Sequence, residues 1–272
     1  MIREAVILAG GISKRLQGYT GGRPKWMIEI HGRPLISYPV MVLRSIGVKR
    51  FVVVVSEVWS QKMESILNAL DIDFCIVRND AVDRENGYSF LLSGKYVTSD
   101  SFFLSMSDHI YSTGLAKNLL IQRFKNIDIL ICGDKKPEYI NIDEATKILT
   151  DNNGHVIKIG KNLRSYTYVD TGLFLIRKRL FKVAEMLSSE KFSFSFSDII
   201  NRAIKLNYVV KVAGITRGFW TEIDTVKDLM EALKGKRRRV VEFVLDELRI
   251  ERRISEQELL LMRLRDYKEH II

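Results

Sequence analysis

The stretch AVILAGG at residues 5–11 decides the fold of this chain, because it is wholly apolar and ends in two glycines. A continuous apolar run of this length is typical of a strand buried on both faces, as in a parallel sheet. The pattern recurs as FVVVV at 51–55, FCIV at 74–77 and FFLSM at 102–106, and helical spacing fills 34–43, 59–70 and 88–96. This alternation predicts an α/β, Rossmann-like fold with a mostly parallel, doubly wound sheet, whose ligands lie at the carboxyl ends of the strands.

The pattern changes after residue 125. Strand-like runs occur at 127–132, 145–149 and 168–176, and the turn signal DNNG at 151–154 predicts a hairpin with residues 155–159. We therefore expect a mixed sheet in the second half. Residues 234–272 begin with the basic run KRRR, continue with helical spacing, and contain a capping box, SEQE, at 255–258. The chain is predicted to consist of a main domain, 1–233, and a basic amphipathic helical tail, 234–272.

Composition excludes several classes of protein. The 272 residues are 46% hydrophobic and 28% charged, which is ordinary for a globular protein. The sequence has no run of about 18 apolar residues and no charged-then-apolar leader, so we expect no transmembrane segment and a cytoplasmic location. Cys75 and Cys132 are far apart in apolar runs and predict core positions rather than a zinc site. The net charge of +10 comes without an aromatic-interleaved basic stripe, so we expect no nucleic-acid partner.

Two loops near the start are suited to phosphates. Glycines directly after a buried strand let backbone N–H groups approach a phosphate chain closely. The candidates here are Leu8, Ala9, Gly10 and Gly11. Arg15 can bind phosphate through two parallel hydrogen bonds, and the loop GRPKWM at 22–27 presents Lys25. A tight turn with solvated cations is the alternative for either loop, but their closeness in the sequence favours phosphate binding.

Two further motifs suggest a base and a metal ion. In ENGYS at 85–89, Asn86 has both a donor and an acceptor with which to read a base edge; the alternative is a turn before a helix. In MSDHIYS at 106–112, Asp108 ends a buried strand, where a carboxylate is well placed to hold Mg²⁺; the alternative is a cap for the next helix. We expect His109 to support the site rather than to act as a base.

Taken together, these motifs resemble the opening of the sugar-phosphate nucleotidyltransferases. The resemblance rests on the glycine turn at 10–11, Arg15, Lys25 after Pro24, and GRPLI at 32–36. Those enzymes join a nucleoside triphosphate to a phosphorylated sugar or alcohol. Residues 12–14 depart from the usual stretch before the arginine, and residues 18–22 lengthen the loop.

Within that family, four strings are similar to those of the archaeal CTP:inositol-1-phosphate cytidylyltransferases. They are NGYS at 86–89, SDHIYS at 107–112, EATK at 144–147 and VDTG at 169–172. The similarity covers about residues 3–233. It implies CTP and inositol 1-phosphate as substrates, CDP-inositol as product for phospholipid synthesis, and Mg²⁺ as cofactor.

The resemblance also implies roles for individual residues. Asn86, Gly87 and Ser89 contact the nucleotide. Lys161 is the better match for a second family lysine, with Lys147 the weaker one, and Asp170 with Thr171 faces the inositol hydroxyls. A second metal carboxylate is expected in WTEIDT at 220–225. Asp224 is preferred for it over Glu222, and the alternative is that Asp224 and Thr225 cap the following helix.

The implied reaction is attack of the inositol 1-phosphate oxygen on the α-phosphorus of CTP. Asp108 and Asp224 hold Mg²⁺, Arg15 binds the β- and γ-phosphates, Lys25 lies between the two reactants, and Lys161 holds the acceptor phosphate. The alternatives are a nucleotidyltransferase for another alcohol or sugar phosphate, such as choline phosphate, and a non-catalytic subunit that keeps the fold.

The tail at 234–272 has three interpretations. It can pack on the main domain as amphipathic helices, mediate a homodimer, or contact a membrane surface peripherally through its basic residues. The first is the simplest, because helical spacing of apolar residues is usually explained by packing on a core.

Overall fold

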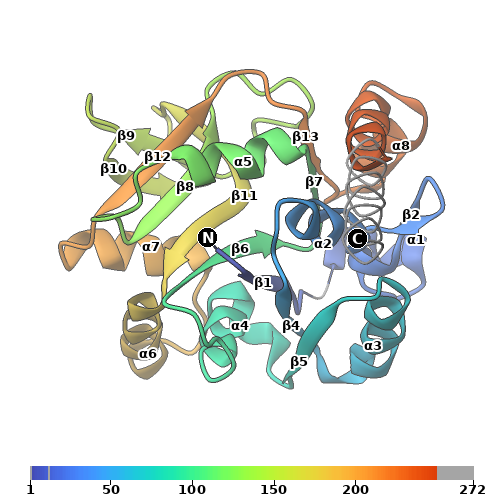
Figure 1. Cartoon of the computed structure of the whole chain (residues 1–272), viewed down its shortest axis with the longest axis horizontal. Helices are drawn as coiled ribbons and strands as arrows, with labels where there is room; N and C mark the ends of the chain where they lie inside the picture. Colours follow the sequence, from blue (N-terminus) through green and yellow to red (C-terminus); the bar gives the residue numbers. More distant parts are fainter. Residues whose placement is uncertain (1, 12, 250–272) are drawn as a thin grey trace, which may run out of the picture.

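The computed structural model describes residues 2–11 and 13–249. A sheet of nine strands forms its centre (Figure 1). One half is parallel and contains β1 (Glu4–Ala9), β4 (Arg50–Ser56), β5 (Asp73–Asn79) and β6 (Ser101–Met106), in the order β6-β1-β4-β5. These are the four apolar runs from which the parallel sheet was predicted, and the prediction is confirmed.

The other half of the sheet is mixed, as expected. The long strand β11 (Tyr168–Arg177) runs antiparallel to β6 on one side and to β8 (Ile129–Asp134) on the other. The edge strand β12 (Val210–Ile215) is parallel to β8, and the hairpin of β9 (Lys147–Thr150) and β10 (Val156–Gly160) joins the start of β11. Because β8 and β12 run in the same direction as β6, the carboxyl ends of all the parallel strands meet at one edge.

Helices cover both faces of the sheet (Figure 1). One face packs against α2 (Ser37–Ser45), α3 (Ser60–Ala69), α5 (Thr113–Ile121) and α8 (Val226–Lys234). The other packs against α4 (Glu85–Ser93), α6 (Phe181–Glu190) and α7 (Phe196–Lys205). Successive side chains of β1 alternate between the two cores, Ile7 entering the first and Val6 and Leu8 the second. This explains why the strands are continuously apolar rather than alternating.

Two helices begin at other residues than predicted. α2 begins at Ser37 and not at Pro34, because Arg33–Pro34 forms β3, paired with β2 (Glu29–Ile30). The short helix α1 (Gln17–Thr20) precedes this pair. α4 begins at Glu85, three residues earlier than predicted, so Asn86 and Gly87 lie in its first turn rather than before it.

The segment after α8 packs on the main core. Residues 238–249 are helical, and Val240, Val241 and Val244 are fully buried in the same apolar cluster as Ile7. The predicted second helix, starting near Ser255, lies outside the described residues. Among residues 2–11 and 13–249, no helix combines the length and the apolar character needed to cross a bilayer.

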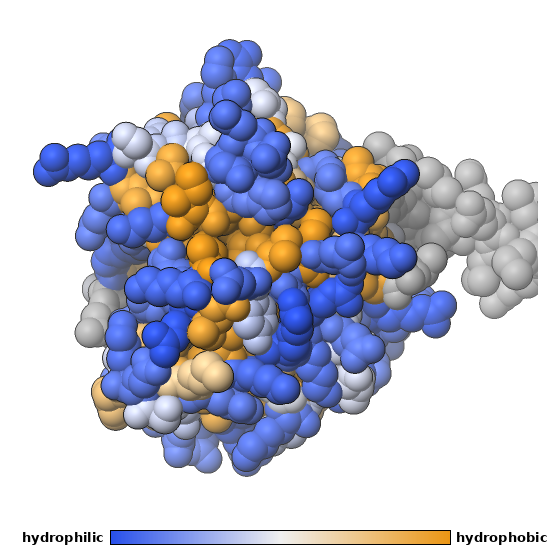
Figure 2. Space-filling model, turned by 90° about the vertical axis from the view of Figure 1, so that its left-hand side faces the viewer, coloured by the Kyte–Doolittle hydropathy of each residue, from blue (hydrophilic) through white to orange (hydrophobic). Residues whose placement is uncertain are grey.

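The end of the molecule on the left of Figure 1, where β9, β10 and α7 lie, carries apolar side chains surrounded by hydrophilic ones (Figure 2). Ile157 of β10 is 54% exposed, and Leu206, directly after α7, is 40% exposed. The β9–β10 hairpin therefore leaves part of its apolar surface uncovered.

Candidate active site

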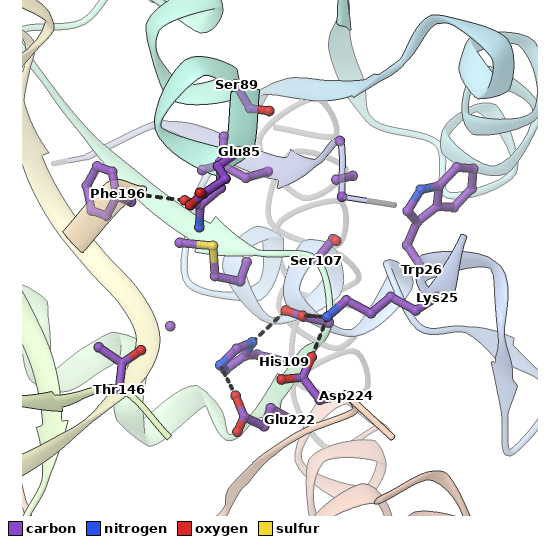
Figure 3. Close-up of a pocket in the computed structure, with 18 of the residues that line it drawn as sticks. Lys25, Trp26, Glu85, Ser89, Ser107, His109, Thr146, Phe196, Glu222 and Asp224 are labelled. Carbon is purple, nitrogen blue, oxygen red and sulfur yellow. Dashed lines mark hydrogen bonds and ion pairs between the residues drawn. The ribbon is translucent and has the colours of Figure 1, made fainter. Parts of the chain in front are cut away.

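A polar cavity of about 320 Å³ opens at the carboxyl ends of β1 and β6. This is the edge at which a doubly wound sheet binds ligands. Most of the site residues predicted from the sequence line it: Leu8, Ala9, Gly10, Gly11, Arg15, Lys25, Asn86, Ser89, Asp108, Lys161, Asp170, Glu222 and Asp224. Figure 3 shows Lys25, His109, Glu222 and Asp224 pointing toward one another from segments distant in the sequence.

A small two-stranded sheet brings the two acidic segments together. β7 (His109–Tyr111) pairs antiparallel with β13 (Trp220–Glu222), and Glu222 lies opposite His109. The backbone N–H of Ile223 donates a hydrogen bond of 3.0 Å to the carbonyl of Asp108. Asp108 and Asp224 therefore approach each other although 116 positions separate them in the numbering.

The glycine turn lies close to α4. A Cβ atom at Gly10 would lie 2.8 Å from Ser89 Oγ and 3.4 Å from Asn79 Nδ2, so any larger residue would push the turn away from the helix. Ser13 has a positive φ of 57°, and its Oγ accepts a hydrogen bond of 2.9 Å from the backbone N–H of Lys25. This contact joins the two cationic loops that the sequence singled out.

Lys25 lies between Asp108 and Asp224, the two carboxylates predicted to hold a metal ion. Figure 3 shows Lys25 and Asp224 facing each other. Its Nζ forms ion pairs with Asp108 and, at 2.6 Å, with Asp224 Oδ1. Burial alone would lower the pKa of Lys25, but Asp108 and Asp224 outweigh it and raise the pKa above its usual value. Burial likewise opposes ionisation of Asp108, yet Lys25 and His109 hold the pKa of Asp108 well below its usual range. Lys25, Asp108 and Asp224 are therefore all charged at neutral pH.

Arg15 extends this network to the mouth of the cavity. Its guanidinium forms ion pairs with Asp224 Oδ2, at 2.6 Å, and with Glu144. Arg15 and Glu144 are 46% and 42% exposed, so an anionic ligand can compete for the arginine. The capping alternative for Asp108 does not apply, because Ser112 is the N-cap of α5. The capping alternative for the second motif holds in part: Thr225 caps α8, but the Asp224 side chain, like that of Asp108, lines the cavity.

His109 is held between carboxylates. Its Nδ1 lies 2.7 Å from Asp108 Oδ1 and its Nε2 lies 3.5 Å from Glu222 Oε2, while its ring stacks on Trp220 at 6.2 Å between centroids. Burial lowers the pKa of His109, but the neighbouring carboxylates, Asp108 above all, raise it to about 9. An imidazole that is already protonated at neutral pH cannot serve as a general base.

Asp170 reaches the cavity because β11 is irregular there. The register with β8 shifts between Asp170 and Phe174, and Gly172 has a φ of +72°. A Cβ at Gly172 would lie 2.6 Å from His109 Cδ2, so glycine is required by both the backbone and the neighbouring ring. Burial raises the pKa of Asp170 to about 6, although the Gly172 N–H donates to its Oδ1 at 2.8 Å.

Similarity to known proteins agrees with this geometry. The family model for the MobA-like NTP transferase domain matches residues 5–191. The chain belongs to this family of nucleotidyltransferases. Among solved structures, it is similar to the inositol-1-phosphate CTP transferase from T. maritima, with a TM-score of 0.82 and 33% identity over 89% of this chain and 96% of that one.

Two curated relatives are bifunctional IPC transferase and DIPP synthases. The chain is 32% identical to the protein from Aquifex aeolicus, over 86% of this chain and 52% of the relative. It is also 32% identical to the protein from Thermococcus kodakarensis, over 84% of this chain and 49% of the relative. The chain thus spans about half the length of these curated relatives.

Two carboxylates of the cavity, Asp108 and Asp224, suit a divalent cation. Among the described residues, no group of three or more His, Cys, Asp or Glu side chains is arranged to hold a metal by itself. Mg²⁺, however, is usually held by one or two carboxylates together with substrate phosphates. Asp108 and Asp224 face each other across a cation, the ammonium of Lys25, so the space between them suits positive charge.

Three predicted residues are not brought to the cavity of the nucleotidyltransferase. Gly87 packs against Phe194, just before α7: a Cβ there would lie 2.4 Å from the carbonyl of Phe194, which accepts the Gly87 N–H. Thr171 is buried, and its hydroxyl donates to the carbonyl of Cys132 at 2.9 Å. Gly87 and Thr171 thus follow Asn86 and Asp170 in the sequence, but the backbone directs them into the interior while Asn86 and Asp170 line the cavity.

Lys147 is the third. Its Nζ donates to the carbonyl of Lys161 at 3.1 Å, so Lys147 supports the segment that carries Lys161 into the cavity. Asn86 does line the cavity, but its Oδ1 accepts the Phe196 N–H at 2.8 Å and so anchors α7. Its acceptor is therefore engaged within the fold.

Several residues at the site were not predicted from the sequence. Glu144 was only part of a quoted string, although it pairs with Arg15. The cavity is also lined by Trp26, Glu85, Ser107, Thr146 and Ser197. Trp26 and Ser107 could have been predicted, because they adjoin Lys25 and Asp108 in the sequence. No motif near Ser197 indicated a site.

Proposed function

We propose that this nucleotidyltransferase transfers CMP from CTP to inositol 1-phosphate, giving CDP-inositol and pyrophosphate. The observation that carries the proposal is the convergence of Arg15, Lys25, Asp108 and Asp224 in one cavity. The similarity to the T. maritima inositol-1-phosphate CTP transferase, over nearly the full length of both chains, supports the choice of substrates.

In the proposed reaction an oxygen of the acceptor phosphate attacks the α-phosphorus of CTP. A new P–O bond forms as the bond between the α-phosphorus and the bridging oxygen breaks, and pyrophosphate leaves with that oxygen. The nucleophile is already anionic, so no general base is needed, which agrees with a protonated His109. The enzyme must instead hold two anions against each other and offset their charge.

The cations of the cavity perform this task. Arg15 binds the β- and γ-phosphates, and Lys25 contacts the α-phosphate and the incoming oxygen. Both pair with carboxylates of the same cavity, so CTP binding exchanges one set of ion pairs for another, and the mostly buried Lys25 is already desolvated and oriented. Lys161, which also lines a neighbouring hollow of about 700 Å³, holds the acceptor phosphate.

Asp108 and Asp224 would hold Mg²⁺ together with phosphate oxygens. When bound, this ion supplies positive charge that offsets the charge of the departing pyrophosphate. Asp170 accepts hydrogen bonds from acceptor hydroxyls, and the loss of such bonds selects against acceptors that lack them.

The test is to identify the product by mass after incubation with CTP, inositol 1-phosphate and MgCl₂. We expect CDP-inositol and pyrophosphate, and neither with excess EDTA. UTP and dTTP replace CTP, and choline phosphate and glucose 1-phosphate replace the acceptor, in a matched panel. Turnover with another pair at a higher kcat/KM would assign a different nucleotidyltransferase, and absence of pyrophosphate release in the whole panel would refute enzymatic function.

A further inference from the structure

A buried arginine from the segment after α8 lies directly behind the active-site cavity. Arg237 is 7% exposed and falls outside residues 5–191, which match the family model. Arginine is almost never this deeply buried unless it is paired. Its partners therefore indicate what it does.

The partners of Arg237 are the two ends of the short segment that carries Glu222 and Asp224 into the cavity. One end is held directly, because Nη1 donates a hydrogen bond of 2.9 Å to the carbonyl of Glu222. The other end is held through Asp228: Nη2 pairs with Asp228 Oδ1 at 2.6 Å, and Asp228 Oδ2 accepts the Asp224 N–H at 3.1 Å. The guanidinium thus holds both ends of the 222–224 segment, on the side away from the cavity.

The middle of the same segment is fixed to the backbone of Asp108. The N–H of Ile223 donates to the carbonyl of Asp108, and the Ile223 side chain is fully buried. With Glu222 held by Arg237 and Asp224 held by Asp228, all three residues have a backbone anchor. A change at Arg237 therefore alters where Asp224 lies relative to Asp108.

The helix at 238–249 keeps Arg237 in position. Val240 and Val244 are buried in the main core, and Glu247 accepts hydrogen bonds from the Thr113 N–H, at 2.8 Å, and from Thr113 Oγ1, at 3.1 Å. Thr113 begins α5, only four positions after His109 of β7. The helix is thus attached to the chain that follows Asp108, while Arg237 is attached to the chain around Asp224.

We propose that Arg237 is a positioning residue of the nucleotidyltransferase, which sets the spacing of Asp108 and Asp224 through Asp228 and the Glu222 carbonyl. The segment after α8 is then part of the catalytic unit rather than an appendage. The inference rests on the proposed role of Asp108 and Asp224 as a pair of metal carboxylates.

The experiment compares Arg237→Met with Arg179→Met in the full chain. Arg179 is itself exposed but forms an ion pair with the buried Asp128, which precedes β8 at the end of that strand away from the cavity, so it controls for the general effect of leaving a buried aspartate without its arginine. Mn²⁺ binding is measured by electron paramagnetic resonance with CTP and without acceptor. The Mg²⁺ concentration for half-maximal pyrophosphate release is measured in parallel.

We expect Arg237→Met to weaken Mn²⁺ binding and to raise the Mg²⁺ requirement about tenfold, a shift of about 1.4 kcal/mol. Arg179→Met should change neither. Asp228→Asn, which keeps an oxygen for the cap but loses the ion pair, should reproduce the effect, and the double variant should add little to it. If Arg237→Met does not fold, Arg237→Lys takes its place, since a lysine keeps the charge but cannot span both acceptors.

Equal metal binding and equal Mg²⁺ requirement in the Arg237 and Arg179 variants would overturn the positioning role. Failure of the proposed function has a different signature, because the wild-type chain would then release no pyrophosphate from CTP and inositol 1-phosphate. The Mn²⁺ measurement does not depend on turnover and still compares the variants in that case.

Discussion

Replacement of Lys25 by methionine should separate two roles of this lysine: competition with a metal ion for Asp108 and Asp224, and stabilisation of developing charge during turnover. Its Nζ lies 2.6 Å from Asp224 Oδ1 and also pairs with Asp108, and the side chains of all three are less than 20% exposed. At an effective dielectric constant near 20, a pair of unit charges about 4 Å apart interacts by about 4 kcal/mol. In the ligand-free protein, Lys25 therefore competes with any divalent cation for the two carboxylates.

The expected result has two opposite parts. Without CTP, the Lys25→Met protein should bind Mn²⁺ about tenfold more tightly than wild type, because a metal ion no longer displaces an ammonium group. With CTP and acceptor, turnover should fall about a hundredfold to a thousandfold, which is the usual cost of losing a group that stabilises developing charge. Metal binding is measured by electron paramagnetic resonance, and turnover by pyrophosphate release.

The control is Lys62→Met on the exposed surface of α3, which should change neither quantity. Circular dichroism checks that the Lys25 variant is folded. Recovery of full turnover at high Mg²⁺ would refute a role of Lys25 in the chemical step, and unchanged Mn²⁺ binding would refute the competition.

Three further predictions follow from the site. Asp108→Ala should lose at least about a hundredfold in turnover while keeping its circular dichroism spectrum, and near-normal pyrophosphate release would remove its proposed role. The Asp170 carboxyl has its pKa raised by burial to about 6, so the native state binds the proton more tightly than the unfolded state and stability falls as pH rises from about 4 to 6. Asp170→Asn should therefore be more stable than wild type by about 2 to 3 kcal/mol at pH 7.5, but not at pH 4, and should raise the KM for the acceptor; urea titrations that show no dependence on pH would contradict this. Gly172→Ala combines a φ of +72° with a contact of 2.6 Å to the His109 ring, and should lower the melting temperature and reduce turnover together. Gly18→Ala, with open space around its Cβ in α1, is its control, and an equal effect of both substitutions would argue against a specific contact at His109.

Local sequence was sufficient to predict the parallel half of the sheet. A strand buried on both faces must be continuously apolar, so β1, β4 and β6 were recognisable without knowledge of their partners. Because the carboxyl ends of such strands share one edge, Gly10 and Asp108 could be expected to meet there. The convergence of Lys25 with Asp108 followed from the resemblance between motifs, and the structure brings the two into contact.

Other features depended on contacts that leave no local pattern. Gly87 and Thr171 lie beside true cavity residues, and only the first turn of α4 and the bend of β11 direct them into the interior. Glu144 pairs with Arg15 across a long sequence separation, and a lone glutamate in a loop has no distinguishing periodicity.

The sequence by itself determined which residues could form buried strands, where the chain turns sharply after them, and which cations and carboxylates accompany those turns. Tertiary structure alone decided that Asp224 faces Asp108, that Lys25 lies between them, and that Arg237 supports the pair from behind. The physical reason is that burial and turn geometry depend on a few neighbouring residues and can be predicted from the local sequence. The spacing of charges in a site, by contrast, is set by backbone hydrogen bonds such as that of Ile223 to Asp108, which join residues far apart in the chain.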